Sequence, residues 1–323
     1  MKQLLRLLLA LLAALGVSPT QTFSWFESGH HLVALLAFDQ LTPHEQQQLL
    51  EILAAHPRYH EDFTPPVTIS DADRWRIGTA GYWPDIARDQ PIYNRPSWHY
   101  QLGATIKLGD LTRLSVPETP GPLPLDASLD TQELYIAQAI ELCKKIFASR
   151  EGRPSDRALS LCWLAHLVGD AHQPCHAGSL YAEGLFPDGD RGANRIPTLQ
   201  SENMHALWDS LLGAEFNEEQ LEKQLRSISE DPRYVRFGLK SLEDSAASHP
   251  LWWLGESRTL AQDFTYSHEV LGPLKAAIKE RASLPTLYLS HQYVEFAKKL
   301  AHVRAIQAGF RLAEVWREGL ANP

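Results

Sequence analysis

Several common motifs of catalysis and ligand binding are missing from this sequence. It has no CxxC pair, no HExxH motif, no P-loop and no glycine-rich dinucleotide signature. Their absence argues against a zinc site made of thiolates, a zincin protease, and the usual nucleotide-binding loops. A metal site in this chain must therefore be built from histidine and carboxylate side chains.

Cysteine itself is scarce. The chain holds three cysteines, which are Cys143, Cys162 and Cys175. In an oxidising compartment this odd number allows at most one internal disulfide and leaves one thiol unpaired. The sequence does not indicate which two would pair.

Positive charge is also in short supply. The chain has 30 lysines and arginines against 39 aspartates and glutamates, so its formal net charge is -9. Proteins that grip duplex DNA through many phosphates need stripes of Lys and Arg, because counterion release supplies most of their affinity. If this protein binds nucleic acid, its positive charge must be concentrated locally.

Long apolar runs are confined to the N-terminus. A leucine-rich run from Leu4 to Val17 follows a basic start and precedes small and polar residues up to Ser24. This pattern predicts a secretory signal peptide over residues 1–24, with an uncleaved anchor as the alternative. No later stretch approaches the ~20 apolar residues of a membrane helix. We expect an exported protein that begins at Trp25, is secreted or periplasmic, and has no membrane anchor after processing.

What the sequence does have is helical periodicity. Apolar residues recur at three- and four-residue spacings over 30–53, 131–147, 160–168 and 290–320, whereas strand-like alternation is hard to find. The glycines and prolines of the stretch 178–200 indicate a loop. Because no linker or repeat divides the chain, we predict an all-α fold with long loops, in a single compact domain over residues 25–323.

The densest group of candidate ligands lies between His166 and His176. His166 and Asp170 stand four residues apart, so on a helix they project from one face and can reach one metal ion. We expect Pro174 to end this helix and His176 to turn back from the following loop. His205 and Asp209 repeat the four-residue spacing further along the chain.

Other candidate ligands lie nearer the N-terminus. Asp85 precedes Arg88 by one helical turn, His99 stands in a Trp-His-Tyr sequence, and His30 follows Trp25 closely. Zinc prefers imidazole nitrogen and carboxylate oxygen, and the full set of histidines and aspartates exceeds the needs of one tetrahedral site. The sequence therefore predicts more than one metal ion.

In their order and spacing these motifs resemble the S1/P1 nucleases, which are trinuclear-zinc single-strand nucleases related to the bacterial zinc phospholipases C. The resemblance covers nearly the whole chain from Trp25 to the segment 308–313. It implies three zinc ions, the first held by Asp85, His99, His166 and Asp170, the second by His176, His205 and Asp209, and the third by Trp25, His30 and the bridging Asp170. In that family the tryptophan binds through its free α-amino group and carbonyl oxygen. Trp25 can serve only as the mature N-terminus.

The resemblance also implies an activity. It is the hydrolysis of phosphodiester bonds in single-stranded DNA or RNA by a metal-activated hydroxide, with 3′-nucleotides as further substrates. Asp85, Asp170 and Arg88 would carry the catalysis, and Arg88 resembles the family arginine that stabilises charge on the phosphoryl oxygens. Tyr100 falls where the family has an aromatic residue that stacks on a base. Asn194 would contact a base or phosphate. We expect the enzyme to be a monomer.

Two positions depart from the family pattern, and the role of a third is open. Leu102 stands where the family often has an aspartate that helps to recognise the base, and Ala193 replaces a family glycine. The base preference is therefore open. His172 could orient a ligand as a neighbour of the metal site, or it could bind a main-chain carbonyl.

Two other functions compete with the nuclease hypothesis. A zinc phospholipase C could use the same metals on phosphatidylcholine-type lipids, but the short interval from Trp25 to His30 and the use of Asp209 instead of glutamate argue against it. A zinc-binding protein without turnover would have no need of Arg88.

Overall fold

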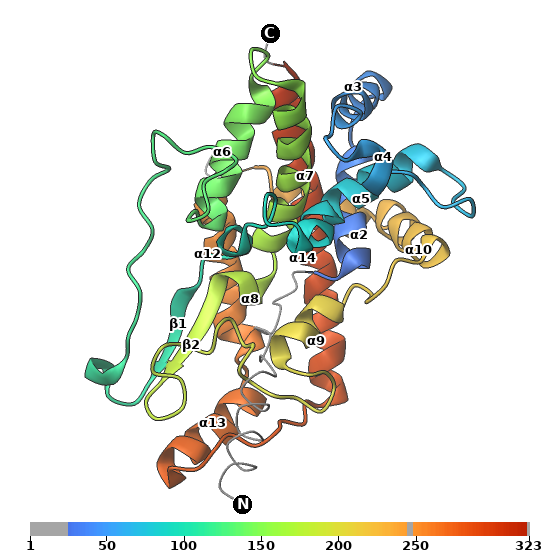
Figure 1. Cartoon of the computed structure of the whole chain (residues 1–323). Coiled ribbons are helices and arrows are strands. Elements are labelled where there is room, and N and C mark those ends of the chain that lie inside the picture. Colours follow the sequence, from blue (N-terminus) through green and yellow to red (C-terminus); the bar gives the residue numbers. More distant parts are fainter. Residues whose placement is uncertain (1–24, 244–247, 322–323) are drawn as a thin grey trace, which may run out of the picture.

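In the computed structural model, the described residues 25–243 and 248–321 fold mainly into helices joined by long loops (Figure 1). The all-α prediction is confirmed, while the predicted signal peptide over residues 1–24 lies outside the described residues. Within the described part of the chain, no helix is long and apolar enough to span a bilayer. The longer helices are α2 (Glu27–Phe38), α3 (Pro43–Leu53), α5 (Ala72–Ile86), α6 (Ile136–Ala148), α7 (Pro154–Ala171), α10 (Glu218–Ser229), α11 (Pro232–Lys240), α12 (Pro250–Leu260), α13 (His268–Glu280) and α14 (His291–Ala321).

The shorter elements lie between these helices. They are the helices α4 (Tyr59–Asp62), α8 (Pro174–Ala177) and α9 (Met204–Ser210), the 3-10 turns η1 (Ala87–Asp89), η2 (Pro96–His99) and η3 (Leu111–Arg113), the π-helical turn η5 (Ala261–Thr265), and the strands β1 (Gly103–Leu108) and β2 (Gly178–Ala182).

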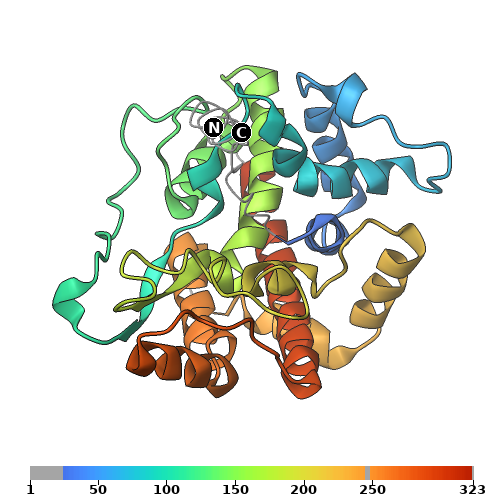
Figure 2. The ribbon, with the colours of Figure 1, turned by 60° about the horizontal axis from the view of Figure 1, so that its bottom comes forward.

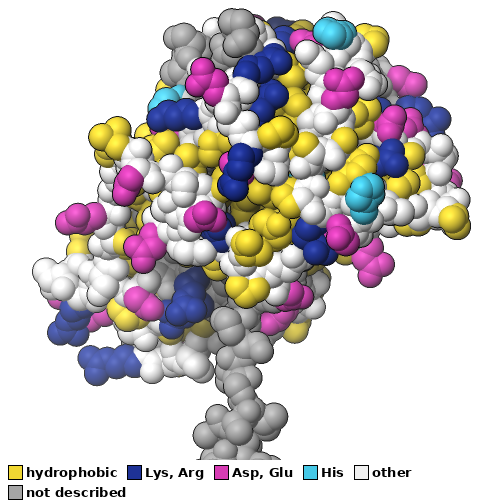
Figure 3. Space-filling view, turned by 45° about the horizontal axis from the view of Figure 1, so that its top comes forward, with side chains coloured by type: hydrophobic (Ala, Val, Ile, Leu, Met, Phe, Trp, Pro, Cys, Tyr) yellow, Lys and Arg dark blue, Asp and Glu magenta, His cyan; other side chains and the backbone are white. Residues whose placement is uncertain are grey.

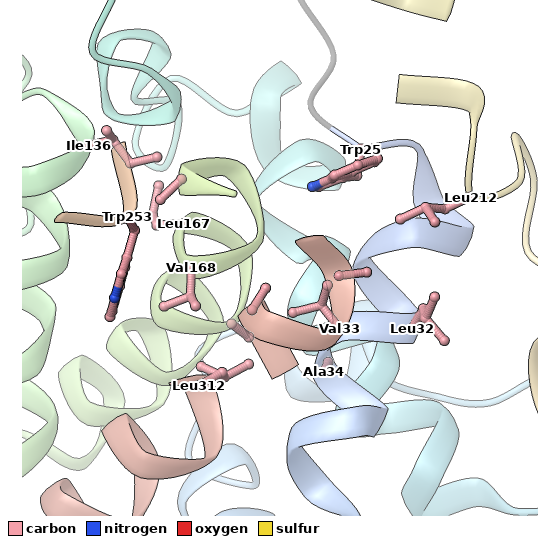
Figure 4. Close-up of a cluster of buried hydrophobic side chains, with 14 of the residues drawn as sticks. Trp25, Leu32, Val33, Ala34, Ile136, Leu167, Val168, Leu212, Trp253 and Leu312 are labelled. Carbon is pink, nitrogen blue, oxygen red and sulfur yellow. The ribbon is translucent and has the colours of Figure 1, made fainter. Parts of the chain in front are cut away.

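Helix α7 forms the centre of the core. All of its residues from Ala158 to Ala171 are buried, and it packs against α2, α3, α5, α6, α12 and α14. Figure 2 shows it in light green, running through the middle of the molecule. In Figure 4, Leu167 and Val168 of this helix lie among core side chains such as Trp253 and Leu312. A helix that is buried on every side can hold polar groups only where they are paired or bind a ligand.

The predicted helical stretch 30–53 is two helices. Helix α2 ends at Phe38 and α3 begins at Pro43, where Thr42 and Glu45 form a capping box. Proline is well suited to the first turn of a helix because its missing N–H would have no partner there. Thr42 accepts a hydrogen bond from the Glu45 amide, so the chain restarts as a helix at this point.

Two sequence predictions were wrong in the segment that follows α7. Pro174 does not end the long helix, because α7 already ends at Ala171 and Pro174 begins the short helix α8. His176 therefore lies in a helix and not in a loop. The predicted loop 178–200 begins as strand β2, which pairs in parallel with β1. All residues of β2 are buried, so the strand lacks the alternation that would have revealed it.

The three cysteines are all free and buried. Burial raises the pKa of each thiol, most clearly for Cys162 and Cys175. The structure contains no disulfide among its described residues.

An ion cluster with two buried arginines joins the C-terminal end of α7 to α12 and α14. Glu256 lies between Arg304 and Arg311, and Arg304 donates to the His172 carbonyl at 3.1 Å. The His172 ring uses both nitrogens: Nδ1 lies 2.7 Å from the Val168 carbonyl, and Nε2 accepts from Arg311 at 2.8 Å. His172 therefore anchors the end of α7.

Replacement of Glu256 by glutamine should destabilise the protein in a pH-dependent way. Burial acts to raise the pKa of Glu256, but Arg311 and Arg304 outweigh it and hold the pKa at about 2. A lowered folded-state pKa means that the stabilisation is present above the unfolded value of 4.5 and is lost as the pH falls toward 2. We expect Glu256→Gln to cost about 3–5 kcal/mol at neutral pH, because two arginines lose their partner.

The check is chemical unfolding of both proteins in chelator from pH 7 down to pH 3. The difference between their free energies of unfolding should shrink toward the acid end. A difference that stays constant with pH would contradict the assignment of the cluster.

Candidate metal centre

Eight of the side chains singled out in the sequence meet at one buried place. They come from α2, α5, η2, α7, α8 and α9, and they form three clusters, within each of which the ligand atoms lie within 4.8 Å of one another. The clusters are His30 with Asp85 and His166, His99 with His166 and Asp170, and His176 with His205 and Asp209. The first two clusters share His166, and the third adjoins them where His176 Nδ1 lies 3.8 Å from Asp170 Oδ2.

Main-chain carbonyls fix the ring orientation of three of the histidines. The Nδ1 atoms of His166, His176 and His205 lie 2.9, 2.5 and 2.6 Å from carbonyl oxygens. A carbonyl only accepts hydrogen bonds, so in each ring Nδ1 carries a proton, and the neutral ring that binds a metal then has its lone pair on Nε2. The carbonyls belong to Gly81, His99 and Gly192 respectively. Histidines that bind metal ions are typically oriented in this way.

The lone pairs of these rings point at one another. His176 Nε2 and His205 Nε2 are 3.2 Å apart, and His166 Nε2 lies 2.9 Å from His99 Nδ1 and 3.2 Å from Asp170 Oδ2. Two nitrogen lone pairs, or a lone pair and a carboxylate, repel each other at these distances. A cation placed between them turns this repulsion into attraction.

Several buried atoms of the centre also lack hydrogen bonds. Among the residues that the structure describes, none forms a hydrogen bond with His99 Nε2, Asp170 Oδ1 or Asp209 Oδ2. Burial, with the charge of Asp170, raises the pKa of Asp209 well above its usual value, even though Gln173 donates a hydrogen bond to it. A bound cation would satisfy these atoms and keep Asp209 ionised. The nitrogen and oxygen donors of the centre therefore fit zinc.

Arg88 lies at the edge of the centre. Its Nε donates to Asp85 Oδ1 at 2.6 Å, and its Nη2 is 3.4 Å from His99 Nδ1. Burial acts to raise the pKa of Asp85, but Arg88 and neighbouring histidines together lower it to about 2. The pair thus combines an ionised carboxylate with a guanidinium fixed beside the clusters.

The start of the described chain is held between two ligand-bearing helices. Trp25 is fully buried, and its indole Nε1 donates to the Gly169 carbonyl of α7 at 3.0 Å. The next amide, that of Phe26, donates to the Asp209 carbonyl of α9 at 3.1 Å. These bonds hold Trp25 close to the backbone of the two helices that carry Asp170 and Asp209.

Comparison with known proteins agrees with this geometry. Residues 25–320 match the S1/P1 Nuclease family. The chain belongs to the S1/P1 nuclease family. It is also 26% identical over 157 residues to Endonuclease 4 of Arabidopsis thaliana, a match that covers 48% of this chain and 48% of that protein. The chain thus spans about half the length of this curated relative. The S1/P1 match includes every residue of the three clusters.

The substrate-binding residues suggested by the S1/P1 resemblance lie beside the clusters. Tyr100 directly follows His99, is partly buried, and packs against Tyr135 with ring centroids 6.2 Å apart and planes at 68°. The side chain of Asn194 turns back within its own loop and donates to the Arg191 carbonyl at 2.8 Å. Leu102, at the position of the family aspartate, packs against Gly192.

Gln173 is a member of the site that sequence reasoning missed. It is fully buried, its Nε2 donates to Asp209 Oδ1 at 2.7 Å, and its Oε1 accepts from the Cys175 amide. One amide therefore orients a carboxylate of the centre and caps α8 at the same time. The one sequence feature that could have indicated a role for Gln173 is its position between His172 and Pro174.

Gly192 is required by a close approach. It has a φ of 62°, and a Cβ at this position would lie 2.1 Å from the Cys175 carbonyl. Its own carbonyl orients His205. Its neighbour Ala193 adopts a φ of 67°, so a positive φ alone does not exclude a side chain in this turn. At Gly192 the side chain is excluded by the close contact with the Cys175 carbonyl.

Gly192→Ala should therefore lower both stability and metal affinity. We expect a loss of about 1–3 kcal/mol in the free energy of unfolding and about 10- to 100-fold in zinc affinity, because His205 loses its orienting carbonyl. Thermal unfolding and competitive zinc titration measure the two effects.

Gly184→Ala is the matched control. Gly184 has a φ of 79°, but a Cβ there would meet no atom within 4 Å. This variant should cost about 1 kcal/mol through backbone strain alone and leave zinc affinity unchanged. Equal zinc affinity in both variants would remove the orienting role of Gly192.

Proposed function

We propose that this protein is a zinc-dependent nuclease that hydrolyses phosphodiester bonds in single-stranded DNA and RNA, with 3′-nucleotides as a further class of substrate. The observation that carries the proposal is the convergence of imidazole lone pairs and carboxylates in three buried clusters. Membership of the S1/P1 nuclease family supports the same reaction.

The proposal includes three zinc ions. The first would be held by Asp85, His99, His166 and Asp170, the second by His176, His205 and Asp209, and the third by Trp25, His30 and the bridging Asp170. When bound, zinc supplies positive charge for the phosphate and a water-derived nucleophile that forms near neutral pH. Such a centre also explains how a chain with a net charge of -9 attracts a polyanion.

The protein's own side chains would bind and orient the substrate. Arg88, held by Asp85, would place its positive charge beside the phosphoryl oxygens, where negative charge grows during cleavage. Tyr100 would stack on a base beside the centre. Bases in a duplex are already stacked on both faces, so this contact favours single strands and tolerates any sequence.

We also propose that the protein is exported as a monomer, secreted or periplasmic, after cleavage before Trp25. The N-terminal sequence pattern supports cleavage at this point. The fully buried position of Trp25 beside the ligand clusters supports it as well, because cleavage there would place a new N-terminus at the centre. The free α-amino group of Trp25 would then become available as a ligand.

The phospholipase and storage hypotheses have less support. Neither the matched family nor the Arabidopsis relative carries a lipase name. A protein that only stored zinc would gain nothing from an arginine buried against a ligand carboxylate, since that charge repels the metal.

A substrate panel tests the proposal. Purified protein that begins at Trp25 is offered denatured DNA, RNA, a 3′-nucleotide, duplex DNA and phosphatidylcholine, each with and without chelator. We expect chelator-sensitive cleavage of DNA and RNA single strands, with duplex DNA cut far more slowly. Release of phosphocholine without nucleotide release would replace the proposal by the lipase, and inactivity of the fully zinc-loaded protein would replace it by storage.

A further inference from the structure

We propose that Arg191 binds a phosphate of the nucleic acid strand at the rim of the metal centre, next to the base held by Tyr100. The inference rests on the proposed nuclease function and adds to it a further residue for binding the strand. It follows from the charge of Arg191, its exposure and the position of its backbone.

The first step concerns the positive charge near the metal centre. Lysine and arginine side chains are interspersed with aspartate and glutamate on the face shown in Figure 3. Near the centre, Arg88 is engaged with Asp85, and Arg258 donates to the carbonyls of Gln101 and Ala177. A strand that runs past the clusters needs a cation that is not already committed.

Arg191 is such a cation. Its side chain is exposed, and none of the described residues forms an ion pair or a hydrogen bond with its guanidinium. Asp188 lies in the same loop, but its carboxylate is hydrogen-bonded to Arg195 at 2.7 Å, and Arg195 is the main cause of its lowered pKa. Arg195 is therefore a paired arginine only four residues away.

The backbone holds Arg191 next to the centre. Arg191, Gly192 and Ala193 have φ values of 58°, 62° and 67°, so they form a left-handed turn. The Gly192 carbonyl in this turn lies 2.6 Å from His205 Nδ1, and the Arg191 carbonyl accepts from Asn194. Because the turn is tied to a histidine of the clusters, the backbone of Arg191 is held close to them.

The same turn lies close to Tyr100. The Gln101 amide, next in sequence to Tyr100, donates to the His176 carbonyl at 3.0 Å, and the neighbouring Cys175 carbonyl lies against Gly192. Leu102, two residues after Tyr100, packs against Gly192 and closes the space between the two segments. A nucleotide whose base stacks on Tyr100 would therefore carry its phosphate within reach of Arg191. The planar fork of arginine suits such a phosphate.

The test compares Arg191→Asn with Arg195→Asn. Asparagine tolerates the left-handed backbone conformation, so the turn should survive the substitution. Each variant is assayed on a single-stranded oligonucleotide over a range of salt concentrations, and on bis(p-nitrophenyl) phosphate, a small phosphodiester without a strand. Zinc content is measured for both proteins. Arg191→Lys tests whether charge alone restores binding.

For Arg191→Asn we expect kcat/KM on the oligonucleotide to fall about tenfold at low salt. The slope of log kcat/KM against log salt should become shallower by about 0.7, the value for one phosphate contact on a single strand. Zinc content and cleavage of the small diester should stay unchanged, and Arg191→Lys should restore most of the slope. Arg195→Asn should behave like the unmodified protein in every assay.

Two results would overturn the inference. One is an unchanged salt slope in Arg191→Asn, and the other is an equal loss on the oligonucleotide and on the small diester, which would place Arg191 in the metal centre. A failure of the proposed nuclease function looks different, since the unmodified zinc-loaded protein would then cleave neither substrate.

Discussion

Asp170→Asn is expected to reduce the bound zinc and to lower kcat/KM on single-stranded DNA by about a thousandfold or more. Asp170 Oδ2 lies 3.1 Å from His99 Nδ1 and 3.2 Å from His166 Nε2, and Asp170 Oδ1 lies 3.5 Å from His30 Nε2. One carboxylate thus faces three histidines, and the proposal makes it the ligand shared by two ions. An amide is neutral and offers one oxygen, so about 4 kcal/mol of transition-state stabilisation should be lost. Metal analysis and steady-state kinetics measure the two effects.

Asp62→Asn is the matched control. Asp62 is another largely buried carboxylate, but it pairs with Arg58 and accepts from Trp83 Nε1 outside the clusters. This variant should be less stable and keep its zinc and its kcat/KM. If Asp170→Asn kept a full complement of zinc, Asp170 would have no place among the ligands.

An extension ahead of Trp25 should have the second largest effect. We expect even two added residues to lower zinc content by about one ion and kcat/KM by about a hundredfold or more, because the α-amino group becomes an amide that cannot bind a metal. Because Trp25 is fully buried and its indole is bonded to the Gly169 carbonyl, added residues would have to enter the interior beside the clusters.

Several measurements check this expectation. Mass spectrometry of the exported protein should find Trp25 as its first residue, and metal analysis should find the lower zinc content only in the extended form. An extension of equal length after Pro323 controls for added chain. Full activity of the N-terminally extended protein would exclude Trp25 as a ligand.

The sequence predicted the centre better than its surroundings. His166 with Asp170 and His205 with Asp209 were recognisable because a four-residue spacing on a helix places both side chains on one face. Asp85, His99 and His30 were candidates by residue type, but only the resemblance to the S1/P1 nucleases grouped them with α7, because nothing in their local sequence shows that η2, α5 and α2 meet it. All of them do meet in the structure.

The supporting residues could not be predicted. Gln173 and the carbonyl of Gly192 act through tertiary contacts that no local pattern records. His172 had two open roles, and only the positions of Arg304 and Arg311, more than a hundred residues away, show that it anchors α7. The same limit applied to β2, which is buried on both sides and so carries no alternation.

The three buried thiols can report local unfolding of the protein. Cys143 lies in α6, Cys162 in α7 and Cys175 in α8, and none can meet a reagent in water until its helix separates from the core. Alkylation rates would therefore measure the opening of three regions separately. Cys175, next in sequence to His176, is the one whose protection should respond to zinc. Because all three cysteines are free, the fold needs no oxidant to reach its native state.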